Sequence, residues 1–296
     1  MLITLDIFSG RPNPSWLLSA KDADKLLQRV AGRAVQDETA VESVLGFRGF
    51  VAAAQGDDSL PAELLSSFRL GGLLPADVTL GDDRTPALTA DESDDAVRWL
   101  LHTGRHVLDD ELQAYVADVL NTRSLGDAPA EPAAEDEGSL QEDAGDARAP
   151  CVIANTAYNA AFWNRPDVQP KNNCYNYAMN HRSDTFAQPG RISGHPIVPP
   201  ITCASVSTAA AWDGCKATCS GSNKNVALVV WPGHDYHWYR RHSNGFWGHK
   251  PGSTAARNTD NRGRVIGGAL TPQNCDRGPY VHFCGYRYSP TGMRVR

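Results

Sequence analysis

A long acidic segment divides the sequence and limits where a hydrophobic core can form. Residues 126–150 read GDAPAEPAAEDEGSLQEDAGDARAP and contain eight acidic residues, one arginine and almost no large apolar side chain. A segment of this composition cannot bury enough apolar surface to offset the entropy lost on ordering, so we expect a tether. The sequence therefore predicts two domains, residues 1–125 and 151–296, joined by an acidic linker over residues 126–150.

Charge and cysteine content also differ between the two halves. Residues 1–150 hold 12 Lys and Arg against 28 Asp and Glu, whereas residues 151–296 hold 16 against 6. All seven cysteines lie in the second half. This difference supports two domains of unlike chemistry, and the opposite charges favour an intramolecular contact between the acidic and the basic half.

The first half is expected to form a small acidic α+β module. Leu2–Phe8 is typical of a strand, and the turn-forming run Ser9–Pro14 ends it. Ser19 is a candidate N-cap for a helix that runs to about Ala31, with Gly32 as its stop. The further expected elements are an uncertain strand over 44–54 and helices over 60–70, 92–102 and 109–122. Nothing in this half has catalytic spacing.

The second half carries the residues suited to chemistry, beginning with Cys174. This cysteine lies between a polar, turn-prone run and a predicted helix over Tyr175–His181. A thiol at a helix N-terminus lies at the positive end of the peptide dipoles, which predicts a pKa below its usual value of about 8.5. The side-chain amides of Gln169 and Asn173 are candidate donors to an oxyanion.

Two histidines lie on a predicted hairpin that follows a buried strand over Val226–Val230. His237 is on the first arm of the hairpin, and His249 is on the second. His237 is the candidate base for Cys174, and His249 is the candidate residue that orients it. Asp260, in a later turn-rich segment, is the alternative orienting residue.

The turn between the two arms decides whether the histidines meet. A two-residue turn at Asn244-Gly245 pairs Arg240 with His249 and places His249 on the face opposite His237. A three-residue turn with Gly245 in the left-handed conformation pairs Tyr239 with His249, on the same face as His237. The sequence allows both.

Cys174-Tyr175, Tyr177-Ala178 and His237 together resemble the papain-like superfamily over roughly residues 165–290. The resemblance implies an α+β domain in which a nucleophile helix packs on an antiparallel sheet. It also implies hydrolysis or acyl transfer at an amide (peptide) bond through a thioacyl intermediate, without a cofactor or a metal. The substrate would be a peptide or another amide.

Aromatic side chains surround the candidate catalytic residues. They are expected to line a substrate cleft or to form the core beneath it: Tyr175, Trp238, Tyr239 and Trp247.

Other functions compete with a cysteine enzyme. Six of the seven cysteines can pair and leave one reactive thiol, which would also suit a non-catalytic, disulfide-bonded binding module. Cys215 and Cys219 with His234 and His237 have a spacing that could hold structural zinc. The basic, aromatic composition is compatible with a histidine-based nuclease or an RNA-binding protein, although the positive charge is scattered.

Location is not determined by the sequence. No apolar run approaches the roughly 18 residues needed to span a bilayer, so no membrane segment is expected. The N-terminus has neither a positive region nor an apolar stretch typical of a secretory signal. A cytoplasmic chain is the default expectation, while the cysteine content suggests export by another route.

Overall fold

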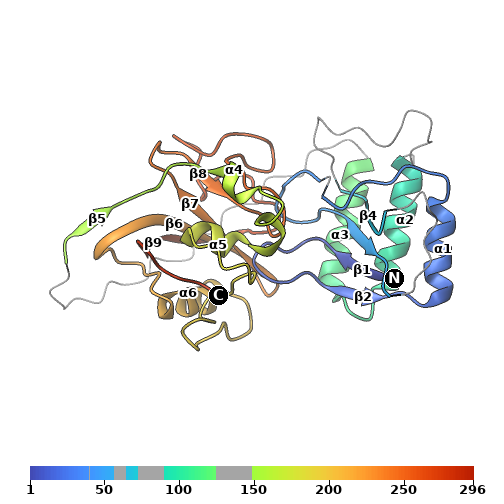
Figure 1. Cartoon of the computed structure of the whole chain (residues 1–296), viewed down its shortest axis with the longest axis horizontal. Helices are drawn as coiled ribbons and strands as arrows, with labels where there is room; N and C mark the ends of the chain where they lie inside the picture. The colour runs from blue at the N-terminus through green and yellow to red at the C-terminus, as the bar shows by residue number, and fades with distance from the viewer. Residues whose placement is uncertain (40, 57–64, 73–89, 125–148) are drawn as a thin grey trace. The chain divides into compact units, whose positions relative to one another are not determined.

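The computed structural model describes residues 1–39, 41–56, 65–72, 90–124 and 149–296 (Figure 1). The chain forms two compact units that contain helices and strands, which confirms the α+β class. The second unit contains the described residues from 149 onward together with two short N-terminal segments, Phe8–Pro12 and Ser43–Gly46. The predicted linker over 126–150 lies outside the described residues except for its last two positions.

The first unit contains an antiparallel sheet with strand order β2-β1-β3-β4. Buried and partly exposed side chains alternate along β1 and β3, as expected of strands with one buried face. The sheet is formed by β1 (Leu2–Leu5), β2 (Ser15–Leu17), β3 (Phe50–Ala53) and β4 (Ser67–Leu70).

The predicted helix over 60–70 is wrong at its described end. Ser67–Leu70 forms strand β4 and pairs with β3, where Phe68 lies opposite Ala52. Phe68 and Leu70 are buried, and this long-range pairing overrides the local helix preference. Residues 57–64 lie outside the described part of the chain.

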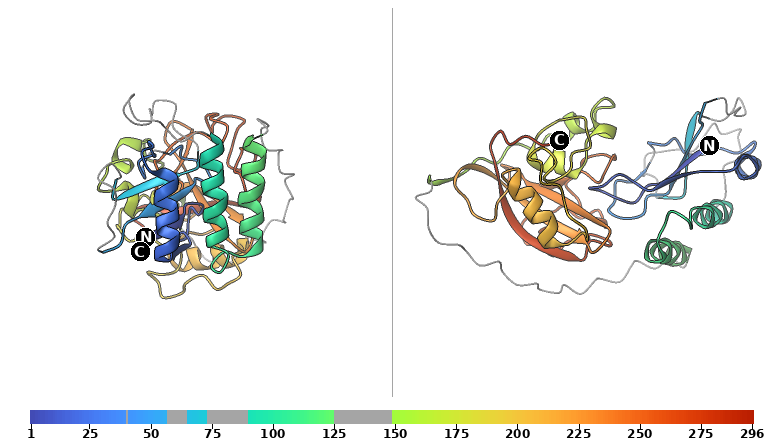
Figure 2. Two further views of the ribbon diagram at one scale, coloured as in Figure 1. Left: turned by 90° about the vertical axis from the view of Figure 1, so that its right-hand side faces the viewer. Right: turned by 90° about the horizontal axis from the view of Figure 1, so that it is seen from below.

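Three helices, α1 (Ala20–Val30), α2 (Ala90–Thr103) and α3 (Asp110–Ser124), belong to the first unit and lie side by side (Figure 2). Ser19 caps α1 by accepting a hydrogen bond from the amide of Asp22, and Gly32 follows the helix with φ of 65°. The predicted cap and stop of this helix are confirmed.

A buried ion cluster supports the sheet of the first unit. The carboxylate of Asp6 lies 2.7 Å from Arg48 Nη2 and 2.9 Å from Arg69 Nη2, and all three side chains are almost fully buried. Burial alone raises the pKa of Asp6, but the charges and hydrogen bonds of the two arginines outweigh it and lower this pKa to about 2.

The second unit contains a five-stranded sheet centred on the long strand β6 (Gly221–Trp231). β6 pairs with β5 (Cys151–Ile153) in parallel and with β7 (Asp235–Arg241) and β9 (His282–Pro290) in antiparallel orientation. β8 (Trp247–His249) pairs with β7. The strand predicted over 226–230 and the following hairpin are present.

Helices α5 (Cys174–Met179) and α6 (Cys203–Trp212) pack on this sheet, where α5 contacts β7 and α6 contacts β6 and β9. Side chains such as Tyr175, Leu228 and Trp238 form an apolar cluster with them. Two shorter helical segments, α4 (Ala160–Trp163) and η1 (Gln169–Lys171), precede α5.

Two disulfides tie the second unit together, which confirms that the chain carries such bonds. Cys151–Cys219 joins β5 to the start of β6, and Cys203–Cys284 joins α6 to β9. The expectation that six cysteines pair is wrong, because Cys215 and Cys275 are free and buried, as is Cys174.

The disulfides also remove the proposed zinc ligands. Cys219 is bonded to Cys151 and cannot supply the thiolate of a Cys215-Cys219 pair. Within the described residues, no group of three or more His, Cys, Asp or Glu side chains could hold a metal ion. In the same part of the chain, no helix has the length and apolar character needed to cross a bilayer.

Candidate thiol–imidazole site

The hairpin brings the two histidines together. Tyr239 pairs with His249, and Gly245 in the turn has φ of 89°, which confirms the three-residue alternative. His237 and His249 therefore share one face of the sheet. Nε2 of His237 lies 2.9 Å from Nδ1 of His249, and Nε2 of His249 lies 2.8 Å from the carbonyl oxygen of Thr259.

When both imidazoles are neutral, these contacts determine which ring nitrogen of His237 and of His249 carries the proton. The carbonyl of Thr259 only accepts, so His249 carries its proton on Nε2 and accepts at Nδ1 from Nε2–H of His237. His237 Nδ1 is then left as an acceptor, which is the form a general base requires.

Burial and stacking hold His249 in place. Burial lowers the pKa of His249 to about 3, so this imidazole is neutral near pH 7. The ring of Tyr239 stacks on it with centroids 4.8 Å apart and an interplanar angle of 27°. This arrangement suits a residue that orients a neighbour rather than one that transfers a proton itself.

Cys174 is the first residue of α5, directly after its N-cap Asn173. Its sulfur lies 3.9 Å from the carbonyl oxygen of Tyr236 and also contacts the backbone of Trp238, both in β7. The prediction of a lowered pKa is wrong for this conformation. Burial, followed by the negative charge of Asp235, raises the pKa of the Cys174 thiol to about 12. The short α5 helix does not offset this burial.

Ser9 lies between the predicted nucleophile and the predicted base. Its hydroxyl is 2.5 Å from Nδ1 of His237, and it also hydrogen-bonds the thiol of Cys174. The same oxygen accepts from the amide of Gly252 at 3.2 Å. Ser9 belongs to the segment Phe8–Pro12, which the sequence analysis treated only as the end of a strand and a turn.

The carbonyl oxygen of Gly10, the next residue, is held by three donors. Asn173 Nδ2 donates to it at 2.8 Å, Gln188 Nε2 at 2.7 Å and the hydroxyl of Tyr236 at 3.2 Å. The side chain of Asn173, a predicted oxyanion donor, thus donates to a peptide carbonyl. Gln188 was missed, because it lies in a loop after α5 and no sequence signal gives the direction of its side chain.

Gln169, the other predicted donor, makes a different contact. Its backbone carbonyl accepts from the buried ammonium of Lys250 at 2.6 Å, as do the carbonyls of Asn172 and Gly252 at 2.5 and 2.7 Å. The positive charge of Lys250 partly counteracts the rise in the pKa of Cys174. Lys250 thus fixes the loops on either side of the site.

A second anchor of the Phe8–Pro12 segment is Asp235, which the sequence analysis did not assign to the site. Its fully buried carboxylate accepts from the amides of Ser9, Gly10 and Arg11 at 2.5, 3.0 and 2.9 Å. The hydroxyl of Tyr280 donates to it at 2.6 Å. Burial raises the pKa of Asp235 although these donors act in the opposite direction.

The alternative orienting residue, Asp260, serves its own loop. Its carboxylate forms an ion pair with Arg264 at 2.8 Å and accepts from the backbone amides of Arg262 and Asp276. The contact to His237 Nε2 is made by His249. Asp260 therefore shapes the turn that follows Thr259, the residue whose carbonyl binds His249.

The four predicted cleft aromatics are all buried. Tyr175 and Trp238 belong to the apolar cluster between α5 and the sheet, and the hydroxyl of Tyr175 donates to Asp213 at 2.9 Å. Tyr239 stacks on His249, and Trp247 packs on Tyr286. They form the core beneath the site, which is the second of the two expected roles.

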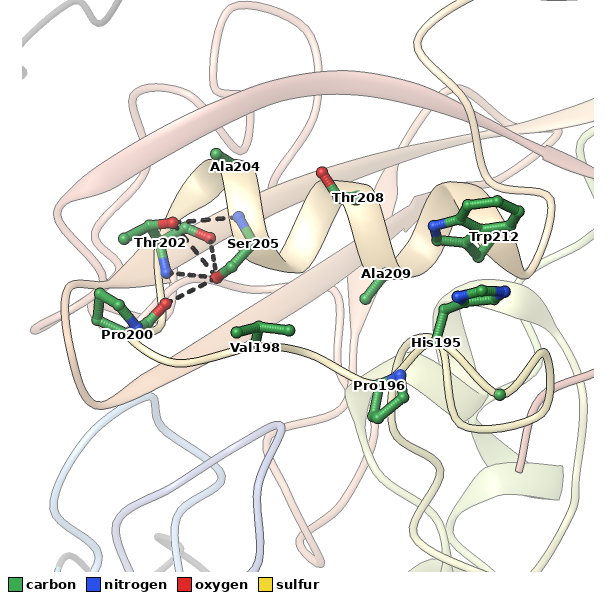
Figure 3. A pocket seen from close by; sticks show the side chains of 11 residues that line it. His195, Pro196, Val198, Pro200, Thr202, Ala204, Ser205, Thr208, Ala209 and Trp212 are labelled. Carbon is green, nitrogen blue, oxygen red and sulfur yellow. Dashed lines mark hydrogen bonds between the residues drawn. The ribbon is translucent and has the colours of Figure 1, made fainter.

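Among the described residues, the second unit has a cavity near the site and another along α6. The first, of about 650 Å³, is lined by Arg11, Gln188, Arg191 and Gly233, together with proline and isoleucine residues, and so adjoins the held carbonyl of Gly10. The other, of about 600 Å³, lies along α6, where the ring of His195 stacks on Trp212 at 3.9 Å (Figure 3). Pro196 lines both.

The fold and the site define an α+β protein whose disulfide-bonded unit places a thiol, two linked imidazoles and convergent amides together. No family model matches the chain, and no solved structure matches it. The chain is 44% identical over 137 residues to insoluble matrix shell protein 1 of Ruditapes philippinarum, a match that covers 45% of this chain and 90% of that protein. The chain belongs to the family of insoluble matrix shell protein 1.

Proposed function

We propose that the second unit is a cysteine-dependent hydrolase or acyltransferase that acts on an amide (peptide) bond. The observation that carries the proposal is the convergence of Asn173 and Gln188 on one peptide carbonyl beside Cys174 and His237. Such preorganised donors stabilise an oxyanion in a site shielded from water. A papain-like arrangement fits the thiol at the start of α5 and the histidines on β7 and β8.

The proposed reaction begins with His237 and His249 neutral and with Nδ1 of His237 unprotonated. Nδ1 of His237 takes the proton of the Cys174 thiol as sulfur attacks the substrate carbonyl, and Asn173 and Gln188 hold the oxyanion. The C–N bond breaks, the leaving amine takes the proton from His237, and a thioacyl group remains on Cys174. Water or another nucleophile then gives up a proton to His237, attacks the thioester and releases the thiol.

The conformation described here is closed. The thiol is fully buried and protonated, and the Ser9 hydroxyl occupies the space between it and His237. Activity therefore requires displacement of Phe8–Pro12. A side chain at Gly10 should achieve this, because a Cβ atom there would lie 2.4 Å from the ring of Tyr236 and 2.6 Å from its carbonyl oxygen.

Acylation by p-nitrophenyl acetate tests the proposal. In full-length Gly10→Val protein, we expect acetylation at Cys174, mapped by mass spectrometry, and release of more than one equivalent of p-nitrophenol. His237→Asn in the same background should slow the reaction by about 10²-fold or more. Equal acetylation of Cys174, Cys215 and Cys275, or no turnover, contradicts the proposal.

The two glutamines provide a matched control within that assay. Gln188→Ala removes a donor to the oxyanion and should lower the turnover rate by roughly 10²–10³-fold. Gln169→Ala removes a side chain whose backbone, rather than its amide group, holds Lys250, and it should leave the rate unchanged. Similar rates for the two variants would contradict the proposed oxyanion site.

A second candidate function is that of a structural component of an extracellular matrix. It is supported by the relative, which is named an insoluble matrix shell protein, and by the two disulfides, which form in oxidising compartments. We therefore propose an extracellular location, and the disulfides do not support the cytoplasmic default. A matrix component should sediment with insoluble material and require denaturant for extraction, with intact disulfides by non-reducing peptide mapping and no turnover at Cys174.

A further inference from the structure

The segment Phe8–Pro12 lies in the site in the manner of a bound peptide. Donors from the site hold the carbonyl of Gly10, and the Asp235 carboxylate holds three successive amides, those of Ser9, Gly10 and Arg11. Main-chain contacts of this kind recognise a backbone in one register, while the pockets around it select side chains.

The side chains on either side of Gly10 also have defined places. Ser9 is fully buried with its hydroxyl against His237. Arg11 lines the cavity of about 650 Å³, donates from Nη1 to the carbonyl of His234 and lies over the ring of Phe8 at 5.4 Å. The segment thus enters through a buried position that takes a small side chain and leaves along an open cavity that has room for the long side chain of Arg11.

Lack of space excludes every residue except glycine at the middle position. A Cβ atom at Gly10 would lie 2.4 Å and 2.7 Å from two ring atoms of Tyr236 and 2.6 Å from its carbonyl oxygen. Real Cβ atoms essentially never come this close, and the backbone carbonyl cannot swing away as a flexible side chain could. Gly10 is not among the glycines with positive φ, so the requirement comes from the available space and not from the backbone conformation.

We infer that this site takes peptides with glycine at the position whose carbonyl is held by Asn173 and Gln188, and that Ser9-Gly10-Arg11 is its built-in occupant. The inference rests on the proposed function, because it names the substrate class of the same site. The occupant is part of the same chain, so its effective concentration exceeds that of a free peptide. Ser9 separates the thiol from the imidazole, which keeps the occupant uncleaved and the site closed.

Alkylation of Cys174 in the full-length protein measures whether the segment covers the site. In wild type, iodoacetamide should label Cys174 as slowly as Cys215, since both thiols are fully buried and burial raises the pKa of each to about 12. Gly10→Val should label Cys174 about tenfold faster or more, with Cys215 unchanged. Ala161→Val is the control, because it introduces a valine at an exposed position of α4 in the same unit.

Asp235→Asn provides a second variant that adds no bulk. The side-chain NH₂ of the asparagine replaces an oxygen that accepts from the backbone N–H groups of Ser9, Gly10 and Arg11. Because a donor then faces donors, the segment should be released. Amide hydrogen exchange of residues 9–11, which does not depend on thiol reactivity, should rise in both variants, while exchange in β6 stays as in wild type. Unchanged exchange of residues 9–11 in both variants would overturn the inference.

Peptide protection tests the glycine requirement. The synthetic pentapeptide of residues 8–12 (FSGRP) added to Gly10→Val protein should slow alkylation of Cys174 back toward the wild-type rate. The same pentapeptide with alanine in place of glycine should not protect. Equal protection by both peptides, or by neither, overturns the proposed specificity.

These measurements separate the inference from the proposed function. Alkylation, exchange and peptide protection require binding but no chemistry, whereas turnover of p-nitrophenyl acetate requires chemistry but no peptide. Glycine-dependent protection without turnover would support a peptide-binding site and contradict the proposed enzymatic function. Turnover without protection would leave the enzyme and contradict the glycine-peptide specificity.

Discussion

One buried carboxylate in each unit, Asp6 in the first and Asp235 in the second, is stabilised in a different way. In the first unit, Asp6 is paired with the cations Arg48 and Arg69, and their charges hold its pKa at about 2. In the second, the carboxylate of Asp235 is held by backbone amides and the hydroxyl of Tyr280, and burial raises its pKa. One acid is compensated by charge, and the other by hydrogen bonds from neutral donors.

The partners of the two carboxylates also differ in how easily they could be lost. The partners of Asp6 belong to its own unit, so the ion cluster is lost only when that unit unfolds. Three of the donors to Asp235 come from Phe8–Pro12, a short segment that is not a strand of the second unit's sheet. A buried carboxylate that loses its hydrogen-bond donors is destabilised, so Asp235 favours the bound position of the segment. The segment can still be released without unfolding of the sheet.

Breaking the ion cluster should have the largest effect on stability. Arg48→Met removes two hydrogen bonds to the buried carboxylate of Asp6 and leaves Arg69 to compensate its charge, so we expect a loss of about 3–5 kcal/mol. Hydrogen exchange of β1 and β3 against urea concentration measures it. Arg33→Met is the control, because the Arg33–Glu92 pair is partly exposed and should contribute about 0–1 kcal/mol. Equal losses would show that burial of the cluster does not matter.

Removing a disulfide should have the next largest effect, and only in the second unit. The Cys203–Cys284 bond closes a loop with a sequence separation of 81, so Cys203→Ala with Cys284→Ala should cost roughly 2–4 kcal/mol. Urea unfolding of β6 and β9 followed by hydrogen exchange checks this. The first half of the chain has no cysteine and is the internal reference. A loss shared by both units would contradict their independent folding.

Acid should destabilise the second unit at a higher pH than it affects the ion cluster of the first. Burial lowers the pKa of His249 from 6.5 to about 3 and that of His242 to about 4, so the unfolded chain binds these protons more tightly. Their contribution is complete above pH 6.5 and is lost as the pH falls toward about 3. The contribution of Asp6 is complete above pH 3.8 and is lost only as the pH falls toward about 2.

Unfolding free energies of each unit between pH 7 and pH 3 check this separation. The raised pKa of Asp235 acts in the opposite direction and reduces the net loss in the second unit. His249→Asn should flatten the pH dependence of the second unit by up to a few kcal/mol, at about 1.4 kcal/mol per pKa unit. The first unit should keep its profile. An unchanged slope in His249→Asn would contradict a neutral, buried His249.

Local signals predicted many elements of the fold. Ser19 and Gly32 identified the ends of α1, and the apolar run over 226–230 identified β6, because caps, stops and hydrophobic runs act within a few residues. Ser67–Leu70 was assigned to a helix because its strand partner, Phe50–Ala53, lies elsewhere in the sequence. Cysteine pairing failed for the same reason, since the two bonds span separations of 68 and 81.

The candidate site shows the same limit. Cys174, His237 and His249 were found by their local context, but the sequence allowed two hairpin registers, and only the conformation of Gly245 decides between them. Ser9 was missed because its contact to His237 spans a sequence separation of 228. The lowered pKa of Cys174 was wrong because a helix-dipole argument omits burial, and this thiol belongs to the apolar cluster between α5 and the sheet.

The smallest expected effect sharpens the comparison between the two acids. Tyr280→Phe removes the hydroxyl that donates to the carboxylate of Asp235. Hydrogen bonds to charged groups contribute about 1.5–3 kcal/mol. Because the three amides of Phe8–Pro12 remain, we expect a loss near the lower end, with faster hydrogen exchange at residues 9–11. Tyr239→Phe is the matched control, since its hydroxyl accepts from the weak donor Cys275 at 3.9 Å and does not bind Asp235, and it should leave that exchange unchanged. If the two variants behave alike, Asp235 does not depend on its neutral donors, and the contrast with Asp6 fails.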